Sequence, residues 1–333
     1  MRTSIRGDPL HTPGAAMETP HPRTHVHAAA ALAASAVTLL AFLTASVLPR
    51  GEILFVIPAW VTPLAAALGV TAAAAMMFRH HSVTTALTAI ALGMLLLAAG
   101  GVFFDIAMPI NYLFVGEPVP DWPMALTRAL ALVAAILLFR ALVRYRRRAL
   151  AQCRDCGRNS TTPPVEQRLW LGYAGFLSGL PYPLLKTHWA LGGTIGLDHS
   201  DLARDGFTRG WLVVPAALVG LVLSLALVHR WGRVWPRWIP GLAGRPTPRG
   251  LLLFGGWFGS GLLLTMGLPA AVQMLGIPGA PAPRPIEGMH AWPPMVFYGS
   301  WLLWGLVLTP ATRFYQLRTR GRCGLCGLGP EPA

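Results

Sequence analysis

Long apolar segments are the feature that most constrains the fold of this chain. Several exceed about 18 residues, the length at which an apolar stretch becomes a candidate to cross a bilayer. Only 12% of the 333 residues are charged and 54% are hydrophobic, whereas soluble globular proteins carry about 25% charged residues. The segments lack period-two alternation and have helical lengths, which argues against transmembrane strands. We therefore predict an all-α fold, a polytopic transmembrane helical bundle embedded in the lipid bilayer.

The apolar segments predict about eight spans. Residues 1–26 are rich in Pro, His, Thr and Arg, and we expect them to form a disordered cytoplasmic tail. The first apolar segment is longer than a signal-peptide core, so we expect it to be retained as a helix. The predicted spans are residues 28–49, 53–78, 82–104, 122–142, 168–191, 210–229, 250–275 and 292–312.

The basic residues predict the orientation of these spans. With the N-terminus inside, 21 of the 27 lysines and arginines fall in cytoplasmic segments and 5 fall outside. Retention of positive charge in the cytoplasm is the usual determinant of topology. The arginines form short clusters at the ends of spans rather than a patch with stacking aromatics, so we do not expect nucleic acid as a partner. Both termini are predicted to be cytoplasmic.

Residues 122–157 and 292–327 resemble each other. Laid together without a gap, the two stretches share ten identities, from a Trp-Pro start to a Cys-x-x-Cys-Gly end. The 23 steps from the tryptophan to the shared tyrosine correspond to roughly 35 Å of helix, enough to place an aromatic ring at each interface. We predict two four-helix repeats of the same orientation, residues 27–160 and 161–333, related by an axis along the membrane normal.

All four cysteines of the chain belong to this repeated element. The cytoplasm keeps thiols reduced, so disulfides are not expected there. A Cys-x-x-Cys-Gly turn directs two thiolates at one ion, and two such turns supply a tetrahedral set. Each turn resembles the knuckle of zinc ribbons and rubredoxins, which implies one zinc or iron per chain. The candidate metal ligands are Cys153, Cys156, Cys323 and Cys326.

Two other interpretations of the cysteines stay open at this point. A Cys-x-x-Cys pair beside an arginine is also typical of a thiol with a lowered pKa that exchanges disulfides. Alternatively, both pairs are inherited residues of a mobile loop and a mobile tail. The retention of the same five-residue element in both copies favours the shared metal site.

The predicted fifth span contains the stretch LSGLPYPLLKTHWALGG, residues 177–193, with the only lysine of the chain. Its two prolines each remove a helix hydrogen bond, so we expect a break or kink there, and broken helices often line binding sites in transporters. The alternative is a lysine that extends its ammonium into the outer headgroups, with ordinary interface residues beside it. The candidate substrate-binding residues are Lys186, His188, Trp189 and Asp105.

Two glycine pairs predict close contacts between helices. Gly175 and Gly179 lie four residues apart in the fifth span, and Gly255 and Gly259 do so in the seventh. Such G-x-x-x-G patterns let neighbouring backbones approach closely in membranes.

The stretch KTHWALGGTIGL, residues 186–197, resembles the His-x-Trp-Ala-x-Gly-Gly stretch of uncharacterised actinobacterial four-helix membrane proteins, although His188 directly precedes Trp189 in this chain. The high content of Ala, Arg and Pro fits such a source. The resemblance implies a helical membrane fold and the plasma membrane of a bacterium, and it implies no activity.

These observations favour a transporter or permease-like protein for an unknown small solute. The alternatives are a metal-stabilised membrane scaffold or sensor and a membrane thiol oxidoreductase. We find no phosphate-binding glycine motif, no His-Glu-x-x-His and no nucleophile elbow. An enzyme is therefore not favoured, and no catalytic residue or protein partner is indicated.

Overall fold

The computed structural model describes residues 23–48, 57–78, 82–105, 121–159, 166, 168–198, 213–280 and 288–329, and every named element within them is a helix. The first half of the chain contains α1 (Arg23–Val47), α2 (Val61–Phe78), α3 (Ser82–Ala98) and α5 (Trp122–Ala149). The second half contains α6 (Leu169–Gly179), α7 (Pro181–Ala190), α9 (Val213–Ala226), the short η1 (Arg230–Gly232), α10 (Arg249–Met274) and α11 (Trp292–Arg318). The predicted all-α class is therefore confirmed.

Five of the described helices are long and apolar enough to cross a membrane: α1 from Val26, α2, α5, α10 and α11. Each of the other predicted spans also coincides with helix, but α3 and α9 are shorter apolar helices and the fifth span is divided into α6 and α7. Five membrane-length helices indicate a membrane-embedded protein, and the number eight stays a prediction. Most of the predicted tail lies outside the described residues, and α1 already begins at Arg23, three residues before the predicted tail ends.

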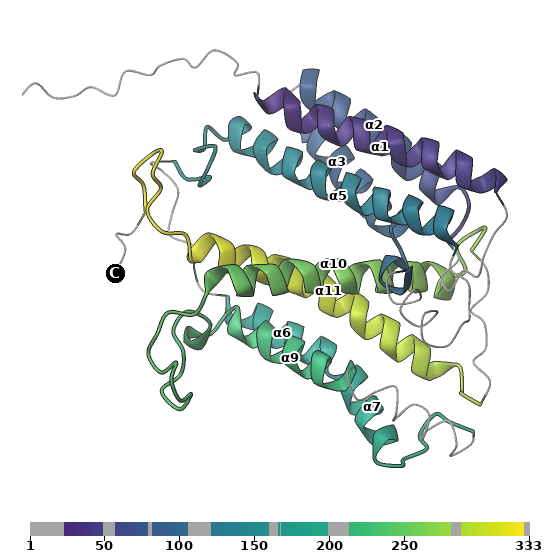
Figure 1. Ribbon diagram of the computed structural model, residues 1–333, viewed down its shortest axis with the longest axis vertical. Helices are drawn as coiled ribbons and strands as arrows, with labels where there is room; N and C mark the ends of the chain where they lie inside the picture. The colour runs from purple at the N-terminus through teal and green to yellow at the C-terminus, as the bar shows by residue number, and fades with distance from the viewer. Residues whose placement is uncertain are drawn as a thin grey trace, which may run out of the picture.

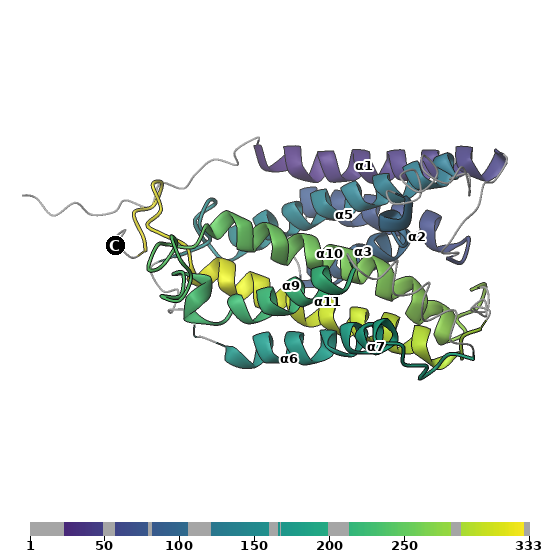
Figure 2. The same cartoon turned by 60° about the horizontal axis from the view of Figure 1, so that its bottom comes forward.

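The helices of each half pack in the same order. In the first half, α1 contacts α2, α2 contacts α3, and α5 contacts α3 and α1. In the second half, α6 contacts α9, α9 contacts α10, and α11 contacts α10 and α6. The two groups meet where α10 lies against α3, and Figure 2 shows these two helices beside each other. If α6 and α7 are counted as one divided span, α10 is the third span of the second half, as α3 is of the first. The third spans of the two halves are thus in contact.

The side chains are distributed as a bilayer requires. The core of the first half is built mainly from alanines, among them Ala72, Ala91 and Ala131, which let its helices approach closely. In the second half the core centres on Trp304 and Tyr315. Large apolar side chains lie exposed on the outside, where lipid would solvate them. Examples are Leu40, Leu126, Leu177, Val219, Phe254 and Leu303.

Glycines bring α6 against its neighbours. A Cβ at Gly179 would lie 2.5 Å from the Trp304 ring and 2.8 Å from Leu221, so only a residue without a side chain fits there. The Trp304 indole N–H, held in this contact, donates to the Ser224 hydroxyl at 2.9 Å. The predicted close contact is confirmed at Gly179 and at Gly255, where an added Cβ would lie 2.7 Å from Leu223. At Gly175 and Gly259 an added Cβ would lie 3.5 and 3.4 Å from the nearest side-chain atom, which is ordinary van der Waals contact.

We predict that Gly179→Ala destabilises the protein by about 1–3 kcal/mol, because the added methyl group overpacks the contact with Trp304. The matched control is Gly261→Ala in α10, where a Cβ would meet no atom within 4 Å. Thermal unfolding of the purified protein in detergent measures both. Equal melting temperatures for the two variants would contradict the packing described here.

Candidate metal centre

The two cysteine turns lie at the same end of the molecule, directly after the long helices α5 and α11 (Figure 1). The last turn of α5 contains Arg146, Arg147 and Arg148. The helix ends at Ala149 and the first turn begins at Cys153, while α11 ends at Arg318 and the second turn begins at Cys323. Both helices begin at a Trp-Pro pair. Helices of nearly equal length therefore carry their turns to the same level.

Each turn is closed by the same two backbone hydrogen bonds. Cys153 N–H donates to the carbonyl of Arg158 and Gly157 N–H donates to the carbonyl of Cys153, both at 2.8 Å. The second turn repeats this with Cys323 N–H to Leu328 O at 3.0 Å and Gly327 N–H to Cys323 O at 2.8 Å. Both glycines have φ +68°, a left-handed conformation that glycine adopts without strain. The glycine in the motif is thus required by the backbone.

The two turns bring all four sulfur atoms together. The four Sγ atoms lie within 4.8 Å of one another, and none forms a disulfide. Cys153 Sγ lies 3.9 Å from Cys323 Sγ, and Cys156 Sγ lies 3.5 Å from Cys326 Sγ. Four ligands at roughly 2.3 Å from a tetrahedral ion are about 3.8 Å apart. The four cysteines are therefore able to hold a metal ion, and the prediction that the turns meet is confirmed.

Backbone N–H groups point at the sulfurs, as expected for thiolates. Arg158 N–H donates to Cys156 Sγ at 3.4 Å. The backbone N–H groups of Cys326 and Leu325 lower the pKa of the Cys323 thiol to about 6. The N–H of Leu328 acts in the same direction on Cys326, but desolvation and the neighbouring sulfurs prevail and raise the pKa of that thiol to about 12. Without a metal ion, the Cys323 thiol therefore loses its proton at a lower pH than the Cys326 thiol, because adjacent thiolates repel each other.

Arginines surround the cluster with positive charge. Arg147 Nε and Arg320 Nη1 are both buried, have no hydrogen-bond partner among the described residues, and lie beside Gly157 of the first turn. A metal dication with four thiolates carries a net charge of about −2. Two partly buried guanidinium groups beside the turn would balance this charge, so the buried N–H groups without partners fit the four-thiolate state.

Arg158 ties the two turns together through hydrogen bonds. Its guanidinium donates to the carbonyl oxygens of Gly321 and Leu328 at 2.8 and 3.1 Å and to that of Arg320 at 2.8 Å. Arg147 acts within the first turn, donating to the carbonyls of Arg154 and Asp155. Neither arginine belongs to the sites predicted from the sequence. A signal in the sequence is the difference between the two turns: Arg158 follows Gly157, but Leu328 follows Gly327.

The structure also places the other predicted site residues. The fifth span breaks at Leu180, between α6 and α7, so the effect expected of Pro181 and Pro183 is confirmed. Lys186 lies on α7 with its ammonium 5.0 Å from the Trp189 ring centre and 5.6 Å from that of Phe297.

The neighbours of Lys186 support the loop that follows α7. His188 Nε2 accepts the N–H of Ile195 at 3.4 Å, and the buried Trp189 donates its indole N–H to the Ile195 carbonyl at 2.8 Å. Asp105 instead forms an ion pair with the buried Arg128 of α5. Lys186, His188 and Trp189 thus share one helix, and Asp105 is engaged elsewhere. Their role in binding a substrate stays a prediction.

Comparison with known proteins adds no assignment, because no protein-family model, no curated protein and no solved structure matches this chain. The resemblance of residues 186–197 to actinobacterial membrane proteins therefore stays a prediction.

We predict that Arg158→Ala lowers the affinity of the cluster for a metal ion by about 10- to 100-fold, because three hydrogen bonds that hold one turn against the other are lost. Arg154→Ala is the matched control, since that side chain is largely exposed. Cobalt(II) titration, read by thiolate charge-transfer absorption, measures both affinities. Equal affinities in the two variants would show that Arg158 does not position the ligands.

Proposed function

We propose that this chain is a metal-stapled membrane scaffold, in which one zinc ion binds Cys153, Cys156, Cys323 and Cys326 and joins the two halves. The observation that carries the proposal is the convergence of the four sulfurs from turns 170 residues apart. A structural zinc site is closed, with four protein ligands and no open position for a substrate. Four cysteines complete such a shell, which supports a structural role over a catalytic one.

The halves are proposed to be two repeats related by an axis along the membrane normal. Three features support this: the matching neighbours of the helices, the identical closure of the two turns, and the pairing of each cysteine with its counterpart 170 residues away. We place the cluster beneath the inner leaflet of a bacterial plasma membrane, with both termini in the cytoplasm, because 21 of the 27 basic residues then lie inside.

We predict that the purified protein contains about one zinc per chain and loses it in Cys153→Ser/Cys156→Ser and in Cys323→Ser/Cys326→Ser. A strong chelator should lower the melting temperature of the native protein, because metal binding contributes directly to the stability of the folded state. Elemental analysis and thermal unfolding measure the two effects. The variant with all four cysteines changed to serine is the control, since the chelator should leave its melting temperature unchanged.

The alternative results separate the parts of this proposal. If elemental analysis finds iron instead of zinc, the proposed identity of the metal is wrong, but the proposal that a metal ion joins the two halves stands. A protein without metal, whose melting temperature does not respond to the chelator, would contradict the staple itself.

A transporter for a small anionic solute is the second candidate, favoured by the break between α6 and α7 and by Lys186 beyond it. Against it, the two aromatic rings described above lie close to the ammonium. The thiol oxidoreductase remains a third hypothesis, which no contact in the described residues favours specifically.

If the protein transports an anion, Lys186→Ala should abolish its accumulation in reconstituted vesicles because the positive charge at the broken helix is lost. Lys186→Arg, which keeps the charge, should retain most of the flux. A panel of radiolabelled small organic anions measures uptake. Absence of uptake across the panel, or equal uptake by both variants, would count against this second candidate.

A further inference from the structure

The segment that joins α9 to α10, residues 227–248, folds into a hydrogen-bonded loop at the cysteine end of the bundle (Figures 1 and 2). We call it the basic loop. Trp235 N–H donates to the carbonyl of Arg245 at 2.9 Å, and the Trp235 carbonyl accepts the N–H of Gly244 at 3.1 Å. These two bonds close the base of the loop, so that residues 236–243 form a defined tip.

Contacts with α11 fix the position of the basic loop. The Tyr315 hydroxyl donates to the carbonyl of Gly232 at 2.9 Å, and Arg318 donates to that of Leu227 at 3.2 Å. Directly after the loop, α10 begins at Arg249, and this helix is long and apolar enough to cross a membrane. The basic loop therefore lies at the level of the lipid headgroups, in the leaflet on the cysteine side.

The basic loop is strongly cationic. Residues 227–248 contain no aspartate or glutamate and four arginines, Arg230, Arg233, Arg237 and Arg245. Both Arg237 and Arg245 are exposed, and neither side chain forms a hydrogen bond or ion pair with another residue in the part of the chain that the structure describes. The two guanidinium groups are thus available to an anionic partner from outside the chain.

The tip of the basic loop also exposes apolar side chains. Trp238, which follows Arg237, is 79% exposed, and Leu242 is exposed as well. Tryptophan is enriched where a membrane meets water, because its ring is apolar and its indole N–H is polar. Arginine and tryptophan together on one short loop beside a membrane-length helix are the chemistry of a contact with an anionic membrane surface.

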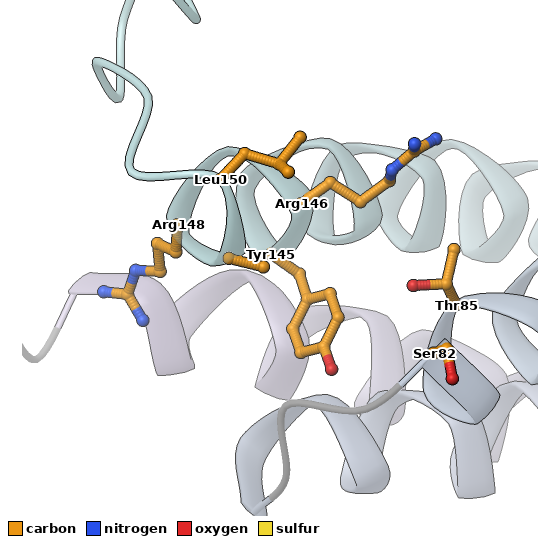
Figure 3. A pocket seen from close by; sticks show the side chains of 7 residues that line it. Ser82, Thr85, Tyr145, Arg146, Arg148 and Leu150 are labelled. Atoms are coloured by element: carbon orange, nitrogen blue, oxygen red, sulfur yellow. The ribbon is translucent and has the colours of Figure 1, made fainter. Parts of the chain in front are cut away.

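A cavity at the same end of the bundle has a different arrangement of charge. Arg146 and Arg148 of α5 line a space of about 530 Å³ together with Ser82 and Thr85 of α3. Their guanidinium groups point away from each other (Figure 3), so they do not converge on one anion. The arginines of α5 and of the basic loop are thus spread over this end, which suits a layer of headgroups better than a single free phosphate.

We propose that the basic loop binds the anionic phospholipids of the leaflet on the cysteine side. Arg237 and Arg245 contact the headgroup phosphates, and Trp238 lies at the boundary between headgroups and acyl chains. An acidic protein would also attract the two arginines. The exposed indole and the position of the loop next to the first residue of α10 favour the lipid as the partner.

The test measures hydrogen–deuterium exchange at the backbone amides of residues 236–243, in the full-length protein reconstituted into nanodiscs. These amides should exchange about tenfold more slowly in phosphatidylcholine mixed with phosphatidylglycerol than in phosphatidylcholine alone. Arg237→Gln/Arg245→Gln should remove most of this difference, because the charge that attracts the anionic lipid is lost. Trp238→Ser should speed exchange in both lipid compositions, since the contact of the ring with the interface does not require lipid charge.

Arg140→Gln/Arg144→Gln is the matched control, because these two arginines are exposed on α5 and the same charge is removed outside the basic loop. This control should keep the protection given by phosphatidylglycerol, and all variants should melt like the wild type in phosphatidylcholine. The proposal is overturned if Arg237→Gln/Arg245→Gln keeps that protection or if the control loses it equally.

Two further measurements separate the lipid from other anionic partners. Inorganic phosphate added to phosphatidylcholine nanodiscs should leave the exchange of residues 236–243 unchanged, and equal protection by phosphate would identify a free anion as the ligand. In cells, the photoreactive variant Trp238→p-benzoylphenylalanine should form adducts with phospholipid, detected by the mass of the modified peptide. Adducts with a protein instead would overturn the assignment of the lipid as partner.

Discussion

The convergence of four cysteine sulfurs depends on a match in length between α5 and α11. Each helix begins at a Trp-Pro pair, and in each case the first cysteine follows the tryptophan by 31 residues. An α-helix rises about 1.5 Å per residue. A difference of three residues in helix length would therefore displace one turn from the other by about the width of one metal ion's coordination sphere. Equal length and common direction thus bring the turns to one level, and the contact between α3 and α10 brings the halves side by side.

The environment of the sulfurs then determines which chemical state is stable. Unbalanced negative charge is costly where thiols are adjacent, as the opposite pKa shifts of Cys323 and Cys326 illustrate. Partly buried arginines beside the first turn, together with the Arg158 bridge to the second, provide compensating positive charge and hold the backbones in position. A bound metal dication would neutralise the cluster further, so geometry and charge favour the same occupant.

The two halves differ most at the cysteine end, where connecting segments have different lengths. In the second half, the carbonyls of Gly232 and Leu227 accept hydrogen bonds from Tyr315 and Arg318. The cores differ too, with alanines in one half and Trp304 packed against Gly179 in the other. The cysteine turns are thus alike in the two halves, whereas the cores and the connecting segments differ.

The sequence by itself determined the helical class, because long apolar stretches can satisfy their backbone groups in lipid only as helices. It also determined the four cysteines that are able to hold a metal ion and the break beside Pro181, since turn chemistry and the lost proline N–H are local properties. The repeated spacing predicted that turns 170 residues apart meet, but only the tertiary structure decided that Asp105 pairs with Arg128 and that Arg158 bridges the turns. These contacts depend on how helices pack within each half and between the halves, and side chains far apart in sequence do not encode that packing in any local pattern.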